Sequence, residues 1–321
     1  MIRVGVEASI EESLLSGFSG EVELVRIPES PTSTIEVDFW IAPLSSATAR
    51  VQWPYLRGVK VVQSLFAGVD ALLKILPRDV TLCDARGVHD IPTAEWAVSA
   101  VLAMQKYFPF YLELQRGHDW EGKNEAEKIY LMQSGTKPGL NMPALIDEVA
   151  DATVLIVGYG AIGQAIEARL APFGPKFLRV ARSARPGVEP VTQLNELLGL
   201  ADIVVLIMPL TSETYHLFDA ERLARMKPGA LLVNAGRGAT VDTDALVDAL
   251  QRKRIRAAVD VVDPEPLPPE HPLWSAPNLL LTPHVASDSP RTLQRAFKLA
   301  VEQVARFSLH EPLHNVVTGE Y

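Results

Sequence analysis

A glycine-rich run near the middle of the chain constrains the fold more than any other feature. The letters GYGAIG occupy positions 158–163, directly after the apolar stretch TVLIV and at the start of a helical pattern, AIGQAIEARLAPFG. In this G-x-G-x-x-G spacing, Gly158 permits a tight turn, Gly160 lets the backbone approach a pyrophosphate, and Gly163 lets the helix pack closely on the strand. The run predicts a dinucleotide-binding strand–turn–helix unit whose helix N-terminus faces the anion; the alternative is an ordinary tight turn. The predicted cofactor contacts in this run are Gly158, Gly160, Ala161, Ile162 and Gly163.

Short apolar runs alternate with helical patterns along the chain. In the first part these runs are IRVGV, VELVRI, DFWIAP and VKVVQS, and from Thr153 they are TVLIV, FLRVA, DIVVLIM, ALLVNAG, RAAVDVV and LLLTP. Near-continuous apolar runs are typical of parallel strands that are covered by helices on both faces. The pattern predicts an α/β protein with two parallel-sheet domains, Rossmann-like or flavodoxin-like, and an active site in the cleft between them.

Length and two helical patterns indicate how the chain is divided. At 321 residues it exceeds the usual size of a single domain. Apolar residues at helical spacing predict one long helix over residues 93–117, with Thr93 as the N-cap, and another from Ser289. Residues 121–144 have Gly and Pro breaks and no sustained period, which is typical of an extended arm that contacts a partner subunit. The predicted domains are a discontinuous substrate-binding domain, residues 1–92 and 288–321, and a dinucleotide-binding Rossmann domain, residues 93–287.

Composition and charge argue against several other classes of protein. Lys and Arg number 30 against 39 Asp and Glu, a net charge of −9, and no dense basic run is present, so nucleic-acid binding is not expected. The first residues lack the apolar core of a signal peptide, and no stretch approaches the ~20 apolar residues that span a bilayer. We therefore expect a cytoplasmic protein with no membrane partner. The single cysteine, Cys83, cannot form an internal disulfide or hold zinc alone, so we interpret it as a core thiol and expect no metal site.

The segment after the second strand of the predicted cofactor unit favours NADP over NAD. An NAD site places an acidic residue about 20 residues beyond the glycines, where it binds the ribose hydroxyls. Here the run FLRVA is followed instead by Arg182, Ser183 and Arg185. Two guanidinium groups flanking a hydroxyl suit bidentate contacts to a 2′-phosphate. We predict NADPH as the preferred cofactor, with NAD also accepted; in the alternative interpretation the arginines only cover a solvated loop.

Three polar residues follow successive apolar runs near the end of the second domain. Arg237 lies between two glycines in ALLVNAGRG, and its planar fork matches a carboxylate. His284 follows the run LLLTP, and imidazole exchanges protons near neutral pH. Glu265, in the proline-rich VVDPEPLPP, could hydrogen-bond the other imidazole nitrogen and tune the proton donor. Singly, each has a plain structural explanation; together, on the sheet edge that carries the glycine turn, they predict a catalytic trio for reducing a 2-oxo acid.

Five motifs, taken in order across residues 59–290, resemble the D-isomer-specific 2-hydroxyacid dehydrogenase family: GYGAIGQAI, PLTSETYHLF, MKPGALLVNAGRG, VDVVDPEPLP and TPHVAS. The resemblance implies the same catalytic trio, with Arg237 and His284 also binding substrate beside the Ala67–Gly68 backbone. It implies Asp260 as the contact to the nicotinamide amide and a homodimer formed through the cofactor domains. The alternative for Asp260 is a carboxylate at a strand end that nearby amides satisfy. The remaining cofactor contacts that we expect are Pro209, Thr214 and Ala235.

Within this family, the arginines at 182 and 185 resemble those of NADPH-dependent glyoxylate and hydroxypyruvate reductases. The formate dehydrogenases carry glutamine where this chain has Glu265, so formate oxidation is not expected. The predicted function is the NAD(P)H-dependent reduction of a small 2-oxo acid to the D-2-hydroxy acid. Two alternatives stay open: reduction of a 2-imino acid at the same site, and an NAD(P)-sensing interaction protein without turnover. We expect the Leu65–Phe66 loop and Trp53 to shape the substrate pocket.

Overall fold

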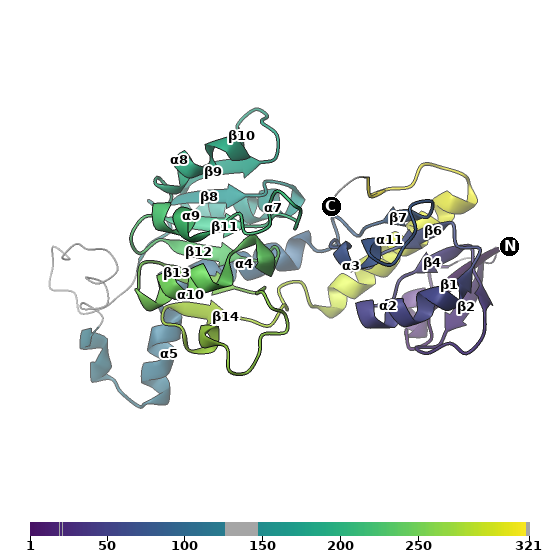
Figure 1. The fold of residues 1–321 in the computed structure, drawn as a ribbon, viewed down its shortest axis with the longest axis horizontal. Helices are drawn as coiled ribbons and strands as arrows, with labels where there is room; N and C mark the ends of the chain where they lie inside the picture. Colours follow the sequence, from purple (N-terminus) through teal and green to yellow (C-terminus); the bar gives the residue numbers. More distant parts are fainter. Residues whose placement is uncertain (19, 21, 126–146, 319–321) are drawn as a thin grey trace. The chain divides into compact units, whose positions relative to one another are not determined.

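The structure is a computed structural model that describes residues 1–318 apart from 19, 21 and 126–146 (Figure 1). It divides into two compact units, one formed by Met1–Asp90 with Asp288–Tyr321 and the other by Ile91–Ser287. Most of the arm predicted at 121–144 lies outside the described residues. Within the described ranges, no helix is long and apolar enough to cross a membrane.

The first unit is built on a parallel sheet. In the part of this unit that the structure describes, the strand order is β2-β1-β4-β6-β7, and every neighbouring pair is parallel. These strands are β1 (Ile2–Glu7), β2 (Val22–Ile27), β4 (Phe39–Ile41), β6 (Val61–Gln63) and β7 (Thr81–Cys83). A separate parallel pair is formed by β3 (Ile35–Glu36) and β5 (Leu56–Arg57). The helices of this unit are α1 (Glu12–Leu15), α2 (Ser46–Gln52), η1 (Trp53–Tyr55), α3 (Asp70–Leu73) and α11 (Pro290–Ser308).

The first unit has apolar core on both faces of its sheet, because successive side chains of a strand point to opposite faces. Phe39 and Ile41 pack with α11 residues on one face, whereas the intervening Trp40 packs with α2 and α3 residues on the other. Successive side chains of a strand point to opposite faces, so a short run of three buried residues needs helices on both sides. Figure 1 shows α11, the yellow helix near the end of the chain, lying along this sheet.

The second unit contains the larger sheet. Its order among residues 91–125 and 147–287 is β10-β9-β8-β11-β12-β13-β14, again parallel throughout. The strands are β8 (Thr153–Val157), β9 (Lys176–Ala181), β10 (Glu189–Pro190), β11 (Ile203–Leu206), β12 (Leu231–Asn234), β13 (Arg256–Val259) and β14 (Leu279–Leu281). The α-helices are α4 (Asp90–Gln105), α5 (Phe108–Arg116), α7 (Ala161–Leu170), α8 (Leu194–Leu198), α9 (Ala220–Arg225) and α10 (Thr243–Gln251). Short 3-10 turns are η2 (Glu121–Glu125), η3 (Ala171–Phe173), η4 (Val191–Gln193), η5 (Gly238–Thr240) and η6 (Pro272–Ser275).

Strand order and packing in the second unit confirm the predicted α/β class with a Rossmann-type sheet. The order reverses between β8 and β11, and ligands of such sheets bind at the carboxyl ends of the strands beside that switch point. One face of the sheet is covered by residues of α8, α9 and α10, and the other by residues of α4 and α7. All six apolar runs predicted from Thr153 onwards form strands, and each contributes side chains to the apolar clusters on both faces of the sheet, with β9 and β14 only partly buried.

The structure corrects the helix predicted from Thr93. Helix α4 begins at Asp90, so Thr93 is a buried residue of its first turn and not the N-cap. The helix also stops at Gln105 instead of continuing to residue 117, because Tyr107 adopts a φ of 52° and Pro109 cannot donate a backbone hydrogen bond. The helix predicted from Ser289 is confirmed as α11, and the Ser289 hydroxyl caps it by accepting from the Thr292 amide at 3.2 Å.

Candidate active site

The glycine-rich turn follows β8 and opens α7, the context that the sequence predicts. Gly158 has a φ of 97°, and a Cβ there would lie 2.7 Å from the backbone of Ile207 and Met208. The amides of Gly158 and Tyr159 both donate to the Val180 carbonyl, at 2.9 and 3.0 Å, which ties the turn to the end of β9. Gly158 is therefore required by the turn itself.

Gly160 and Gly163 face different surroundings. A Cβ on Gly163 would meet the Gly158 carbonyl oxygen at 3.1 Å and Ile156 at 3.2 Å, so this glycine serves the contact of α7 with β8. A Cβ on Gly160 would meet only the Gly158 carbonyl oxygen, at 4.0 Å. Within the described chain, therefore, no neighbouring atom is close enough to require glycine at position 160. The open space beside the N-terminus of α7 would fit a pyrophosphate group.

The predicted 2′-phosphate loop lies beside this turn. Strand β9 ends at Ala181, and Arg182, Ser183 and Arg185 follow it as exposed residues. The Arg185 Nη2 donates to the Tyr159 carbonyl of the glycine turn, and its guanidinium lies 5.8 Å from the Tyr159 ring centre. Arg182 forms an exposed ion pair with Glu213, with 3.7 Å between Nε and Oε2. The arginines thus present positive charge where the adenosine ribose of a dinucleotide would bind.

An ion pair that supports the glycine turn was not predicted from the sequence. Arg179, on β9, makes two hydrogen bonds of 2.6 Å to the carboxylate of Glu167 on α7, and it stacks on the Tyr159 ring at 5.6 Å. These hydrogen bonds hold the pKa of the Glu167 carboxyl below its ordinary value, although partial burial opposes the shift. Burial, in turn, raises the pKa of Tyr159. The one signal for this ion pair in the sequence was a charged residue, Arg179, inside the apolar strand run FLRVA.

Arg237 is fixed through its backbone by a short loop after β12. The Asn234 side chain accepts from the Gly236 amide at 3.1 Å and donates to the Arg237 carbonyl at 3.1 Å, and Thr240 Oγ1 donates to the same carbonyl at 2.7 Å. A Cβ on Gly238 would lie 1.9 Å from the Val262 carbonyl oxygen, so this loop packs against the segment after β13. The half-buried Arg237 side chain donates to the Gly236 carbonyl at 2.8 Å.

Glu265 and His284 meet, as the sequence predicts. Glu265 lies in the loop after β13, between Pro264 and Pro266, and His284 follows β14. The Glu265 Oε1 and His284 Nδ1 atoms are 2.5 Å apart. This contact leaves the imidazole Nε2 as the nitrogen available to a ligand, and both side chains are partly exposed. Because β12, β13 and β14 are neighbours in one parallel sheet, Arg237 and this pair follow adjacent strands on one edge.

Asp260 holds the backbone that carries His284. It is buried, with 2% of its surface exposed, and its carboxylate accepts from Thr282 Oγ1 at 2.5 Å and from the amides of Val285 and Ala286 at 2.9 and 2.8 Å. The His284 amide donates to the Asp260 carbonyl at 2.7 Å, in a turn where His284 has a φ of 54°. These contacts to nearby amides are the structural alternative that the sequence left open for Asp260, and its contact to the nicotinamide amide stays a prediction.

The other predicted site residues lie in defined turns. Thr214 Oγ1 donates to the Pro209 carbonyl at 2.8 Å and accepts from the Thr211 amide at 2.7 Å, so Thr214 shapes the loop after β11. The Ala235 amide donates to the Leu206 carbonyl at the end of β11, at 3.2 Å. Ala67 and Gly68, half-buried, lie in the turn before α3 in the first unit. The ligand contacts of these residues remain predictions.

Trp53, which the sequence predicts in the substrate pocket, lies in the first unit. Trp53 packs on Trp40, their ring centres 5.6 Å apart, and its role in the substrate pocket stays a prediction. Within the described ranges, no three His, Cys, Asp or Glu side chains gather closely enough to hold a metal ion.

Comparison with known proteins decides the family. Residues 98–286 match the model described as D-isomer specific 2-hydroxyacid dehydrogenase, NAD binding domain. The chain belongs to the D-isomer specific 2-hydroxyacid dehydrogenase family. The matched segment contains the glycine turn, the arginine loop, Arg237, Glu265 and His284.

Relatives and solved structures extend the similarity to most of the chain. A glyoxylate reductase of Thermofilum pendens is 36% identical over 255 residues, which are 77% of this chain and 71% of that protein. The crystal structure of an NADPH-dependent glyoxylate/hydroxypyruvate reductase from Sinorhizobium meliloti, in complex with NADP and sulfate, superposes with a TM-score of 0.81 at 28% identity, covering 99% of this chain and 98% of that one. A family member from Xanthobacter autotrophicus, in complex with NADPH and MES, gives 0.76 at 29% identity, covering 98% of each chain.

Proposed function

We propose that this chain is an NADPH-preferring reductase that converts a small 2-oxo acid, of the glyoxylate or hydroxypyruvate kind, into the D-2-hydroxy acid. The observation that carries the proposal is the Glu265–His284 hydrogen bond, 2.5 Å long, on the sheet edge that also carries the glycine turn and Arg237. A partly exposed imidazole, held by a carboxylate through one nitrogen, presents its other nitrogen as a proton donor. The names of the relatives support the substrate class.

The residues present fit a nicotinamide dinucleotide. Gly160 and the N-terminal turn of α7 would receive the pyrophosphate, and Arg182, Ser183 and Arg185 would receive a 2′-phosphate. Asp260 would accept from the nicotinamide amide. When bound, the reduced cofactor supplies the hydride that adds to C2 of the substrate.

The chain's own residues have separate parts in the reaction. The Arg237 guanidinium binds the substrate carboxylate and polarises the neighbouring carbonyl, with the backbone of Ala67 and Gly68 contributing to the carboxylate site. His284 donates the Nε2 proton to the carbonyl oxygen as the oxygen gains charge, and Glu265 stabilises the imidazolium and fixes its orientation. Overall, one 2-oxo acid, one NADPH and one proton give one 2-hydroxy acid and one NADP⁺.

Cofactor preference, assembly and location are further parts of the proposal. NADPH preference is supported by the exposed arginine pair beside the glycine turn and by NADP in complexes of similar proteins. We further propose a homodimer formed through the cofactor domains and a cytoplasmic location. Light scattering of the purified chain, with and without NADPH, tests the dimer.

The test is NADPH oxidation, with NADH in parallel, against glyoxylate, hydroxypyruvate, pyruvate, phenylpyruvate and 2-oxoisovalerate, each with and without methylamine. Wild-type protein and His284→Asn are compared, since asparagine keeps a short polar side chain that tolerates the φ of 54° at this position. We expect amine-independent turnover with glyoxylate or hydroxypyruvate that His284→Asn lowers by about 10²–10⁴-fold. NADPH oxidation that requires methylamine would indicate an imine reductase. Binding of the cofactor without any turnover would indicate a sensing protein.

A further inference from the structure

The loop that precedes Ala67 and Gly68 is held by three of its carbonyl groups. The Ser64 carbonyl accepts from Gln63 Nε2 at 2.8 Å, and the Phe66 carbonyl accepts from the Ala85 amide at 3.0 Å. Between them, the Leu65 carbonyl lies 2.9 Å from the Nε2 of a histidine 24 residues further along the chain, His89. A carbonyl can only accept, so this histidine nitrogen carries the hydrogen.

His89 is a buried residue that contacts the loop twice. Only 6% of its surface is exposed, and besides the hydrogen bond to Leu65 its ring stacks on Phe66, with 5.7 Å between ring centres and 26° between planes. Burial lowers the pKa of His89; Asp90, Asp288 and Arg295 are the charged groups that face it. The imidazole therefore contacts both of the residues that lead into the Ala67–Gly68 turn.

The backbone around His89 is itself anchored to α11. Arg295 of α11 donates from Nε to the Val88 carbonyl at 3.1 Å and from Nη2 to Thr292 Oγ1 at 3.1 Å. His89 thus supports the loop from a fixed position, because the residue before it is bonded to a 19-residue helix.

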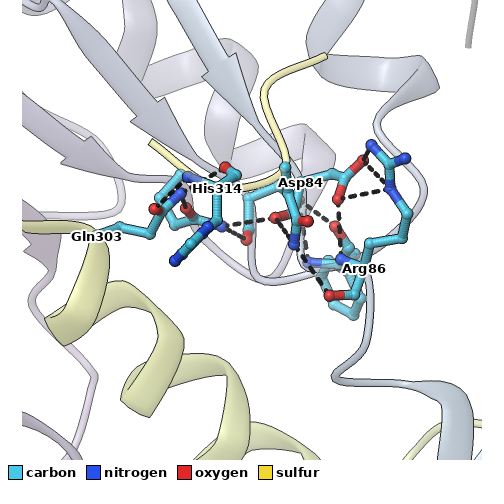
Figure 2. Close-up of polar contacts among 8 residues, drawn as sticks. Asp84, Arg86, Gln303 and His314 are labelled. Atoms are coloured by element: carbon cyan, nitrogen blue, oxygen red, sulfur yellow. Dashed lines mark hydrogen bonds and ion pairs between the residues drawn. The ribbon is translucent and has the colours of Figure 1, made fainter. Parts of the chain in front are cut away.

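A second cluster of buried hydrogen bonds anchors Gln63, the residue at which the loop starts. Gln303 of α11 donates to the Gln63 side chain at 3.0 Å and to the His314 carbonyl at 2.8 Å, and Gln63 donates to the Asp84 carbonyl at 3.0 Å. The Asp84 carboxylate is fully buried beneath the Arg86 guanidinium, at 3.0 Å. Figure 2 shows this cluster, with Gln303 at one end and Arg86 at the other. The start of the loop is therefore held at Gln63 by buried hydrogen bonds, and His89 supports the residues that follow.

We propose that His89 is a positioning residue for the substrate: its hydrogen bond to the Leu65 carbonyl, together with the stack on Phe66, fixes the turn whose backbone binds the 2-oxo acid carboxylate. This inference rests on the proposed function, which gives the Ala67–Gly68 turn its role. Without the imidazole the Leu65 carbonyl is buried and unpaired, so the turn has to move. The consequence is a poorer fit for the 2-oxo acid, whereas the cofactor site, built from other elements, is untouched.

Two variants separate the two contacts. His89→Gln keeps an N–H donor at the reach of Nε2 and loses the ring, whereas His89→Phe keeps a ring on Phe66 and loses the donor. His310→Asn is the matched control, because His310 is an exposed histidine of the same unit with a φ of 57° that asparagine tolerates. The measurements are kcat and KM for the best 2-oxo acid, Kd for NADPH, and hydrogen exchange of the amides at 64–69.

We expect His89→Phe to raise KM for the 2-oxo acid about 10-fold or more and to lower kcat, because a small misplacement of a binding group costs at least that much. The Kd for NADPH should stay within about 2-fold of the wild type, a change too small to count as a lost contact. His89→Gln should recover most of the KM, His310→Asn should behave as the wild type, and the 64–69 amides should exchange faster in His89→Phe alone.

Three results would overturn the proposal: an unchanged KM in His89→Phe, an equal loss of NADPH affinity, or no difference between His89→Gln and His89→Phe. If His89→Phe does not fold, the comparison of His89→Gln with His310→Asn decides, since full loss of function in His89→Gln contradicts a role for the donor. A wild-type protein without turnover on any 2-oxo acid would refute the proposed function instead, and exchange at 64–69 would still report whether His89 holds the loop.

Discussion

Replacing Gly160 by alanine should weaken cofactor binding strongly in a protein that remains folded. The residue adopts φ −102° and ψ −152°, which alanine accepts, and its added Cβ would meet only one atom, at 4.0 Å. Alanine restricts the unfolded chain, which stabilises the protein by ~0.4–1 kcal/mol. It is a poorer N-cap than glycine by roughly 0.5–1 kcal/mol, so the two effects nearly cancel and the free energy of unfolding should change by less than ~1 kcal/mol. The methyl group, however, would occupy the space into which the pyrophosphate has to move.

Gly158→Ala is the matched control, because the same change two residues earlier costs stability. A left-handed φ of 97° in a non-glycine residue costs ~1–2 kcal/mol, and the 2.7 Å contacts of the new Cβ with Ile207 and Met208 add ~1–3 kcal/mol of overpacking. The two terms together predict a loss of about 2–5 kcal/mol for Gly158→Ala.

The assay pairs thermal unfolding without cofactor with a fluorescence titration of NADPH. Losing one charge-assisted hydrogen bond to the pyrophosphate costs ~1.5–3 kcal/mol, so Kd for Gly160→Ala should rise about 10- to 100-fold or more while Tm is nearly unchanged. Wild-type affinity in Gly160→Ala, or a Tm loss equal to that of Gly158→Ala, would refute the reasoning that this glycine serves the ligand alone.

Three further predictions concern the proton donor, the cofactor loop and the buried thiol. Glu265→Gln should lower kcat/KM by about 10²-fold or more with little change in NADPH Kd, because the contact to His284 Nδ1 persists without its charge; equal effects on both quantities would contradict this role. Arg182→Ala should weaken NADPH about 10-fold and leave NADH within about 2-fold, since only NADPH carries the 2′-phosphate; an equal loss for both dinucleotides would contradict the 2′-phosphate contact. Burial raises the pKa of Cys83 from 9.0 to about 12, so above pH 9.0 only the unfolded thiol ionises. The free energy of unfolding should then fall by ~1.4 kcal/mol per pH unit more than in Cys83→Ala, measured from urea midpoints; parallel slopes in the two proteins would contradict the shift.

The strands and the sheet edge of the site could be predicted from the sequence because their signals are local. The apolar runs before Gly158 and Arg237 are almost fully buried and the run before His284 is partly buried, and in each case hydrophobicity alone marks the strand and its end. The meeting of Glu265 with His284 followed from their places after neighbouring parallel strands. Such inferences need only the periodicity and the strand order of an open parallel sheet.

Features that depend on distant partners could not be predicted. His89 bonds to a carbonyl 24 residues away, and Gln303 bonds to a side chain 240 residues away, so nothing near either residue marks its role. The helix break at Tyr107 was missed because apolar spacing continues through Pro109. For Asp260 the sequence left a cofactor contact and bonds to nearby amides both open, and only the folded turn shows that the amides at 285 and 286 donate to it.

Deuteride transfer from cofactor to substrate tests the central claim most directly. Wild-type protein and His284→Asn would be incubated with glyoxylate and NADPH deuterated at C4 of the nicotinamide, with methylamine in a parallel sample, and the products analysed by mass spectrometry. The account predicts glycolate with one deuterium at C2, formed one-to-one with NADP⁺ by the wild type and only in trace by His284→Asn. Deuterated N-methylglycine in place of glycolate, or glycolate formed equally by both proteins, would contradict it.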